Sequence, residues 1–217
     1  MAREGEGRRR GREPPGSGRP SEPEKPMRVY AKAQVCPFRL SRAQWGELSN
    51  FFPLAAPIAA GPWRFFTSEA VYQAAKFATR PDVQQRIAEA PTARKAAAIG
   101  RTPGLGIDPG WNAQRVDVMR WVLRMKRESN AAEIDAVLAA TGDRPIVEVS
   151  VRDPWWGARP VADRYEGRNV LGRLWMELRQ QLRDADPAAR SGAWLDRIRV
   201  GPLADRPGAP GTVREAA

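Results

Sequence analysis

The sequence contains no histidine and only one cysteine, Cys36, and both scarcities exclude kinds of chemistry. Histidine is the side chain most often used as a general base, so any proton transfer here falls to carboxylates, lysine, tyrosine or water. A zinc site of the usual nitrogen and sulfur type has no ligand set. A single cysteine also excludes a disulfide within the chain. We therefore expect no metal site, and we expect the protein to work in a reducing compartment.

The sequence also has no apolar run of about 18 residues and no apolar segment near its N-terminus. A membrane-spanning helix requires about 20 apolar residues, and a signal peptide requires a shorter apolar core. These absences predict a cytoplasmic protein with no membrane partner.

Negative charge is in the minority in this chain. Lys and Arg number 36 against 25 Asp and Glu, which leaves a formal net charge of +11. Such an excess favours partners that carry phosphate, namely nucleotides, sugar phosphates or nucleic acid, without choosing among them.

Composition divides the 217 residues into one folded segment with two tails. Residues 1–27 are almost entirely Arg, Gly, Glu, Pro and Ser, which bury too little apolar surface to offset the entropy of ordering. We expect a disordered basic tail there. Residues 186–217 are predicted to be largely disordered as well, although Trp194, Leu195 and Ile198 could form one helical turn. The remaining segment, 28–185, is predicted to be one domain.

Helical periodicity dominates that domain, so the predicted fold class is mainly α with a few short β-strands, in a single compact domain. Trp111 opens the longest predicted helix, with Asn112 as its N-cap, and Ser129 or Asn130 caps the next helix, which Gly142 closes. The other helices are expected at 67–77, 82–89, 92–99 and 170–183, and the strands at 29–35, 63–66 and 146–150.

The helix at 67–77 has the most informative side chains. Thr67 or Ser68 can cap it, and Glu69 lies in the first turn, where the helix dipole favours a negative charge. Glu69 and Lys76 recur on the side opposite the apolar residues, two turns and about 10 Å apart, which is too far for a simple ion pair. This side is either a solvated face with a capping glutamate or a wall that binds a ligand.

Three further spots place polar and aromatic residues on loops or at helix starts, where binding groups concentrate. They are Leu48-Ser49-Asn50-Phe51-Phe52, Pro109-Gly110-Trp111-Asn112, and Arg152-Asp153-Pro154-Trp155-Trp156-Gly157-Ala158. A carboxylate beside two indoles suits a flat heterocycle stacked on a ring. Structural explanations remain open for each spot: an Asx turn at Asn50, a turn at Asp153-Pro154, and packing of the indoles on the core.

The order and spacing of these motifs resemble the NADAR family, named for NAD and ADP-ribose, which includes N-glycosidases of riboflavin-biosynthesis intermediates. The matching segments span roughly 36–185, and one departure is Ala70-Val71, where many members have His-Tyr. The segments are LSNFFP, TSEAVYQAAKF, GWNAQRVDVMRWVLRMK, VLAATGDRPIVEVS, DPWWGA and GRNVLGRLWMELRQQL.

The resemblance implies hydrolysis of an N-glycosidic bond between a ribose phosphate or ADP-ribose and a base-like heterocycle. Residue by residue, it carries functional roles to Glu69, Lys76, Trp111, Asp153, Trp156, Gly157 and Asn169. Ribosyl C–N cleavage passes through an oxocarbenium-like state, so the site needs a carboxylate near the ribose and an acid near the leaving group. Glu69 is assigned the first role and Asp153 the second.

The remaining side chains are assigned to substrate binding. Trp111 and Trp156 would stack on the base, and Asn50 and Asn169 would orient hydroxyls or loop backbone. Lys76 would bind phosphate or a ribose hydroxyl, or would capture the opened sugar aldehyde as a Schiff base. The reaction requires neither a metal nor an organic cofactor.

Two other functions remain compatible with the sequence. A non-catalytic nucleotide or nucleic-acid binder is favoured by the basic tail and by the basic residues of one helix, Arg115, Arg120, Arg124, Lys126 and Arg127. The other is an enzyme that removes ADP-ribose from guanine bases in nucleic acid, which would combine a basic surface with a glycosidase site.

Overall fold

The computed structural model describes residues 27–184. The predictions made for the two tails, including a helical turn near Trp194, lie outside these residues. In the described part the fold is mainly helical with short strands, as the sequence predicted. The helices are α1 (Ser68–Ala74), α2 (Pro81–Ala88), α3 (Ala93–Gly100), α4 (Trp111–Ser129), α5 (Ala131–Ala140) and α6 (Val170–Asp184).

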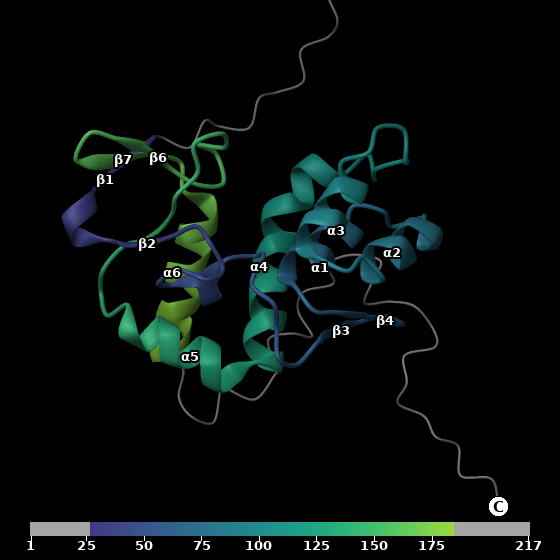
Figure 1. The fold of residues 1–217 in the computed structure, drawn as a ribbon, viewed down its shortest axis with the longest axis horizontal. Helices are drawn as coiled ribbons and strands as arrows, with labels where there is room; N and C mark the ends of the chain where they lie inside the picture. Colours follow the sequence, from purple (N-terminus) through teal and green to yellow (C-terminus); the bar gives the residue numbers. More distant parts are fainter. Residues whose placement is uncertain (1–26, 185–217) are drawn as a thin grey trace, which may run out of the picture.

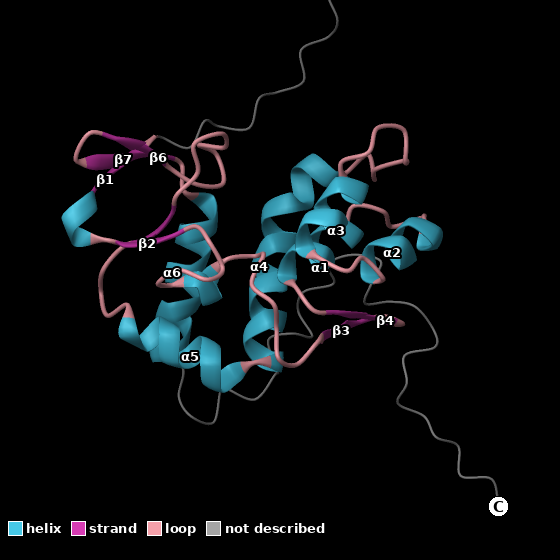
Figure 2. Ribbon diagram, in the orientation of Figure 1, coloured by secondary structure: helices cyan, strands magenta, loops and turns pink. Residues whose placement is uncertain are grey.

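The strands of the described residues form three small sheets around these helices (Figure 2). One is antiparallel in the order β1 (Arg28–Ala31), β7 (Arg164–Gly167) and β6 (Arg159–Val161). A second pairs β2 (Cys36–Phe38) in parallel with β5 (Ile146–Glu148). The third is a hairpin of β3 (Ile58–Ala60) and β4 (Trp63–Phe65).

The single strand predicted at 29–35 is wrong in its length. A 3-10 turn at Lys32–Gln34 divides it, so that β1 pairs with β7 while β2 turns away to pair with β5. One segment of chain thereby joins two sheets. The strands β3, β6 and β7 were not predicted.

Helix α4 lies between two groups of helices, with α1, α2 and α3 on one side and α5 and α6 on the other (Figure 1). It contacts α1, α5 and α6 directly. Helix α6 buries Leu171, Leu174, Trp175 and Leu178, which follow the i, i+3, i+4, i+7 spacing of one inward face. The indole N–H of Trp175 donates to the carbonyl of Leu48 at 2.9 Å, so α6 also holds a loop of the N-terminal half.

Two of the three predicted N-cap positions are confirmed. Thr67 caps α1 by accepting from the N–H of Ala70, and Asn130 occupies the N-cap position of α5, although its side chain makes no cap hydrogen bond. Thr92, which was not predicted as a cap, caps α3 by accepting from the N–H of Lys95. The cap predicted at Asn112 is wrong, because α4 begins one residue earlier and Gly110 occupies the cap position. A turn starts this helix instead: Asp108 Oδ1 accepts from the N–H of Gly110.

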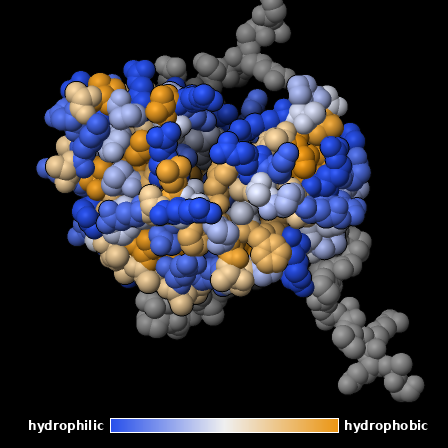
Figure 3. Space-filling model, in the orientation of Figure 1, coloured by the Kyte–Doolittle hydropathy of each residue, from blue (hydrophilic) through white to orange (hydrophobic). Residues whose placement is uncertain are grey.

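The face of the molecule in Figure 3 is mostly hydrophilic, with apolar residues in scattered groups. No helix within residues 27–184 is both long and apolar enough to cross a bilayer.

Candidate active site

A cavity of about 440 Å³ opens where α1, the start of α4, β5 and the loop after β5 meet. Six of the eight predicted site residues line it: Asn50, Glu69, Lys76, Trp111, Asp153 and Trp156. They come from four segments that are far apart in the sequence, so the fold gathers the motifs around one hollow. The other two predicted residues, Gly157 and Asn169, lie behind the wall of the cavity.

Glu69 is a buried residue in the wall of the cavity. Every residue of α1 is buried, so the polar side of this helix faces the cavity and is not a solvated face. Gln73 Nε2 donates to Glu69 Oε1 at 2.8 Å, and the largely exposed Arg101 approaches the same oxygen at 3.8 Å. Burial raises the pKa of Glu69, while the bond from Gln73 and the charges of Arg101 and Lys76 oppose that rise.

Three aromatic rings form one side of the cavity. The Tyr72 ring lies edge-on to Trp111 at 5.0 Å and to Trp156 at 5.6 Å between centroids. Such a cluster offers polarisable aromatic surface to a ring-shaped ligand. Trp155 is not part of the cavity lining; it packs against the core and its ring lies 3.9 Å from the guanidinium carbon of Arg115.

Positive side chains surround the opening and balance the carboxylates within. Arg39 and Arg101 are exposed, and Arg115 is partly buried with an Nε that has no hydrogen-bond partner. Lys76 Nζ lies 5.8 Å from the ring centres of both Tyr72 and Trp111. Burial lowers the pKa of Lys76. All four cations line the cavity, which suits a ligand that carries an anionic group.

Asn50 reaches the cavity from a loop that a buried lysine holds in place. Lys126 has no exposed surface, and its Nζ donates to the carbonyls of Glu47 at 2.5 Å and Ser49 at 2.9 Å. The carbonyl of Asn50 in turn accepts from the N–H of Glu69 at 2.9 Å. Burial lowers the pKa of Lys126 to about 7. This lysine therefore fixes the loop backbone next to Glu69.

The five basic residues of α4, which favoured a nucleic-acid binder in the sequence, do not form one free basic face. Arg120 is paired with Asp117 and Glu177, and Arg127 is paired with Asp135. Arg124 donates to Gln181. Of the five basic residues that suggested a nucleic-acid surface, one is buried, three are engaged with side chains of the protein itself, and Arg115 belongs to the cavity.

Two carboxylates line the cavity on the side of β5. Asp153 is exposed, and its Oδ1 accepts from the backbone N–H of Trp155 at 3.1 Å and of Trp156 at 3.0 Å, an Asx turn that shapes the loop. Glu148, which the sequence reasoning did not select, ends β5. Its Oε2 is buried without a hydrogen-bond partner. Burial, together with the negative charges of Asp153 and Glu69, raises the pKa of Glu148 to about 8.

Gly157 and Asn169 act on the backbone of β5. A side chain at Gly157 would place its Cβ 2.6 Å from the carbonyl oxygen of Glu148, so only glycine allows this approach. Asn169 Nδ2 donates to the carbonyl of Ile146 at 2.8 Å, and its Oδ1 accepts from the N–H of Glu148 at 3.0 Å. Both residues therefore affect the cavity indirectly, because they fix the backbone position of Glu148.

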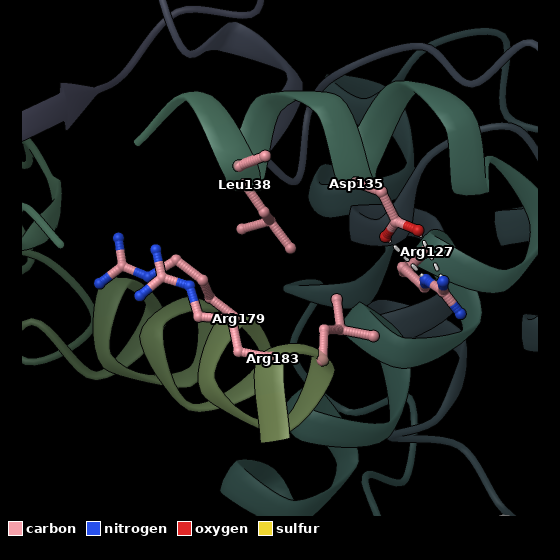
Figure 4. Close-up of a pocket in the computed structure, with 7 residues that line it drawn as sticks. Arg127, Asp135, Leu138, Arg179 and Arg183 are labelled. Carbon is pink, nitrogen blue, oxygen red and sulfur yellow. Dashed lines mark hydrogen bonds and ion pairs between the residues drawn. The ribbon is translucent and has the colours of Figure 1, made fainter. Parts of the chain in front are cut away.

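A second cavity, of about 230 Å³, lies between α5 and α6 (Figure 4). Arg127 and Asp135 pair across one end of it, and Arg183 is bonded to Asp143 and to the carbonyl of Gly142. Arg179 donates to the hydroxyl of Thr141 at 2.8 Å. These charged groups are already paired, and no aromatic side chain lines this cavity. The second cavity therefore has neither the free acids nor the aromatic wall of the first. No three His, Cys, Asp or Glu side chains in residues 27–184 gather closely enough to hold a metal ion.

Comparison with known proteins identifies the same family that the sequence motifs resemble. The model of the NADAR domain matches residues 37–183. N-glycosidase YbiA of Escherichia coli (strain K12) is 36% identical over 138 residues, which cover 64% of this chain and 82% of that relative. Riboflavin biosynthesis protein VVA0006 of Vibrio vulnificus is 34% identical over 144 residues, 65% of this chain but 37% of that protein. The NMR structure of the E. coli protein YbiA aligns with a TM-score of 0.57 and 33% identity, covering 69% of this chain and 86% of that one.

Proposed function

Because this chain belongs to the NADAR domain family, we propose that it hydrolyses the N-glycosidic bond between a ribose phosphate and a nitrogen heterocycle of the kind found in riboflavin-biosynthesis intermediates. The enzyme class, a hydrolase of N-glycosyl compounds, is that of the relatives named N-glycosidase. The single observation that carries the proposal is the cavity itself, which joins a buried carboxylate, an aromatic wall and a ring of cations within about 440 Å³.

Each part of the cavity matches one part of such a substrate. The tryptophans Trp111 and Trp156 offer their faces to the heterocycle. The cations at the opening, Arg39, Arg101 and Arg115, suit a phosphate, which arginine binds through its fork of N–H donors. Glu69 lines the same cavity, where it would face the ribose that joins the two.

Glu69 acts on the ribose side of the reaction. As the C–N bond breaks, positive charge develops at the anomeric carbon, and a nearby carboxylate stabilises it through the low dielectric of a buried site. The same carboxylate then takes a proton from the attacking water. The bond from Gln73 to Glu69 Oε1 holds the carboxyl group in one orientation for both steps.

Lys76 and Asn50 complete the ribose side. The lowered pKa of Lys76 increases the neutral fraction of its amine, which either binds a hydroxyl or phosphate oxygen or attacks the opened sugar aldehyde. Asn50 is fixed by the loop that Lys126 holds and can orient a ribose hydroxyl. On the side of the heterocycle stand the two acids Asp153 and Glu148.

The test is product analysis. The full chain is incubated with a pyrimidine whose exocyclic amine carries ribose 5-phosphate, and with ADP-ribosylated guanosine, and the products are identified by mass spectrometry. Release of the free heterocycle and ribose 5-phosphate by the wild type, but not by Glu69→Gln, is the expected result. No release from either compound would refute the proposal.

The second substrate tests an alternative that the exposed cations at the opening favour. Arg39 and Arg101 reach solvent, so they could also contact the diphosphate of an ADP-ribosyl group attached to guanine. Faster turnover of ADP-ribosylated guanosine, and faster turnover again within an oligonucleotide, would move the proposal to removal of ADP-ribose from nucleic acid. The loss of the basic face on α4 weakens the other alternative, a non-catalytic nucleic-acid binder.

A further inference from the structure

Glu148 is the acid in the cavity whose bonding is incomplete. Its Oε2 is buried and has no hydrogen-bond partner, while the side chain lines the same hollow as Glu69 and Trp156. A buried polar atom without a partner costs free energy, about 1–3 kcal/mol in proteins, so its presence calls for a ligand that supplies the missing bond.

Both backbone groups of Glu148 are hydrogen-bonded by residues of two sequence motifs. Asn169 Oδ1 accepts from its N–H at 3.0 Å, and the N–H of Ala158 donates to its carbonyl at 2.7 Å. Gly157 packs against that carbonyl, where no larger residue fits. Two of the motif residues that were expected to bind substrate thus position Glu148, which makes it the group that these motifs support.

Asp153 differs from Glu148 in each respect that matters for donating a proton. Asp153 is exposed, and its Oδ1 already accepts two N–H groups of its own loop. Glu148 is only partly exposed and its Oε2 is buried, and this burial together with two other negative groups favours the protonated carboxyl at neutral pH, with a pKa of about 8. A general acid must carry its proton before the bond breaks, and Glu148 meets that condition.

We propose that Glu148 is the catalytic acid that protonates the departing heterocycle, and that Asp153 shapes the loop and keeps Glu148 protonated through its charge. This assignment rests on the proposed N-glycosidase function. The C–N bond breaks with its electron pair on nitrogen, and the Glu148 hydroxyl proton moves to that nitrogen. Water adds to the anomeric carbon and loses a proton to Glu69. The products are the free heterocycle N–H and the sugar hydroxyl, and the proton returns from Glu69 to Glu148 through solvent.

The first test is the pH dependence of kcat/KM for the phosphoribosylamino pyrimidine. In the wild type we expect the rate to fall as pH rises through about 8, because Glu148 then loses the proton that the leaving group needs. Glu148→Gln should lower the rate at pH 7 at least a hundredfold and remove this alkaline fall. Asp153→Asn keeps the acceptor oxygen of the Asx turn, so it is the matched control.

The two variants separate the two roles. Removing the charge of Asp153 should lower the pKa of Glu148, so the alkaline fall of Asp153→Asn should move to lower pH. The opposite pattern would overturn the assignment: an alkaline fall retained by Glu148→Gln and abolished by Asp153→Asn, or a Glu148→Gln rate within threefold of the wild type.

A second measurement does not depend on turnover. Infrared spectra of protein labelled with ¹³C-glutamate should show a protonated carboxyl band at pH 6.5 that is lost by pH 9.5, and Glu148→Gln should lack it. A band at pH 6.5 that the variant keeps in full would show that Glu148 is ionised and would overturn the proposal. A wild type that cleaves no N-glycoside would instead refute the proposed function, and the leaving-group role with it, whereas normal turnover by Glu148→Gln would refute the role of Glu148 alone.

Discussion

Replacing Glu69 by glutamine separates its chemical role from a structural one. The amide has the same shape as the carboxyl group and can still accept the N–H of Gln73, now 2.8 Å from Oε1. It cannot carry negative charge or take a proton from water. We therefore expect Glu69→Gln to fold normally and to lose turnover.

The size of each effect follows from the contacts of Glu69. The bond from Gln73 is worth about 1 kcal/mol and survives the change. The ion pair with Arg101 is long, at 3.8 Å, and Arg101 is 68% exposed, so its loss should cost less than about 1 kcal/mol. Loss of a positioned general base lowers rates by about 10² to 10⁴, which corresponds to about 3–5 kcal/mol in the activation barrier.

The pH dependence of the free energy of unfolding provides a second comparison between the wild type and Glu69→Gln. Burial raises the pKa of Glu69 in the folded protein, so the folded state binds more protons than the unfolded state above pH 4.5. The wild type should therefore lose stability relative to Glu69→Gln as pH rises above that value. At pH 8 the variant should be at least as stable as the wild type, and at pH 4 the difference should be smallest.

Thermal melts followed by circular dichroism, and rates measured on the same sample, decide the matter. Glu89→Gln is the control, because Glu89 is an exposed glutamate at the end of α2. It should change neither quantity. The reasoning fails if Glu69→Gln keeps more than a tenth of the wild-type rate, or if it melts far below the wild type while the remaining folded fraction is fully active.

Three further changes test other parts of the site. Trp156→Ala should weaken binding of the intact nucleotide about fivefold to a hundredfold and leave binding of ribose phosphate nearly unchanged, whereas Trp155→Ala should affect both little; calorimetric titration of both ligands checks this. If Lys76 forms a Schiff base, borohydride added during turnover should attach the sugar to the protein, and Lys76→Arg should remove the mass increase seen by mass spectrometry. Lys126→Met leaves two buried carbonyls without their donor, so it should cost about 1–3 kcal/mol by urea denaturation at pH 7. That cost should grow at pH 9, because a folded-state pKa of about 7 makes the wild type gain stability as pH rises from 7 toward 10.5.

The helices were predictable from the sequence because their signals are local. A threonine before an apolar repeat was enough to place the start of α1, and Thr67 does cap it. The strands β6 and β7 were missed because both begin with an arginine, one contains a proline, and neither shows a buried alternating face. The pairing of β7 with β1 depends on residues more than 130 positions earlier, which no local pattern reveals.

The site residues that belong to a recognisable sequence motif could be predicted. A residue whose chemical role depends on its burial in the folded protein could not. Six predicted residues do line one cavity. Glu148 was overlooked because alternation in β5 makes it the polar member of a strand, which ordinarily faces water. Here the polar side faces an internal hollow, as it also does in α1. Its position five residues before Asp153, at the end of a buried strand, is the signal that could have found it.

The loop that carries Asn50 is held by side chains that lie much later in the sequence and are therefore synthesised later. Lys126 bonds to Ser49 across 77 positions of sequence, and Trp175 bonds to Leu48 across 127. During synthesis this wall of the cavity therefore lacks the bonds from Lys126 until α4 has been made and the bond from Trp175 until α6 has been made, even though α1 and Glu69 are already complete. A nascent or prematurely terminated chain would carry Glu69 without a formed pocket, so the proposed activity should begin only with the finished domain.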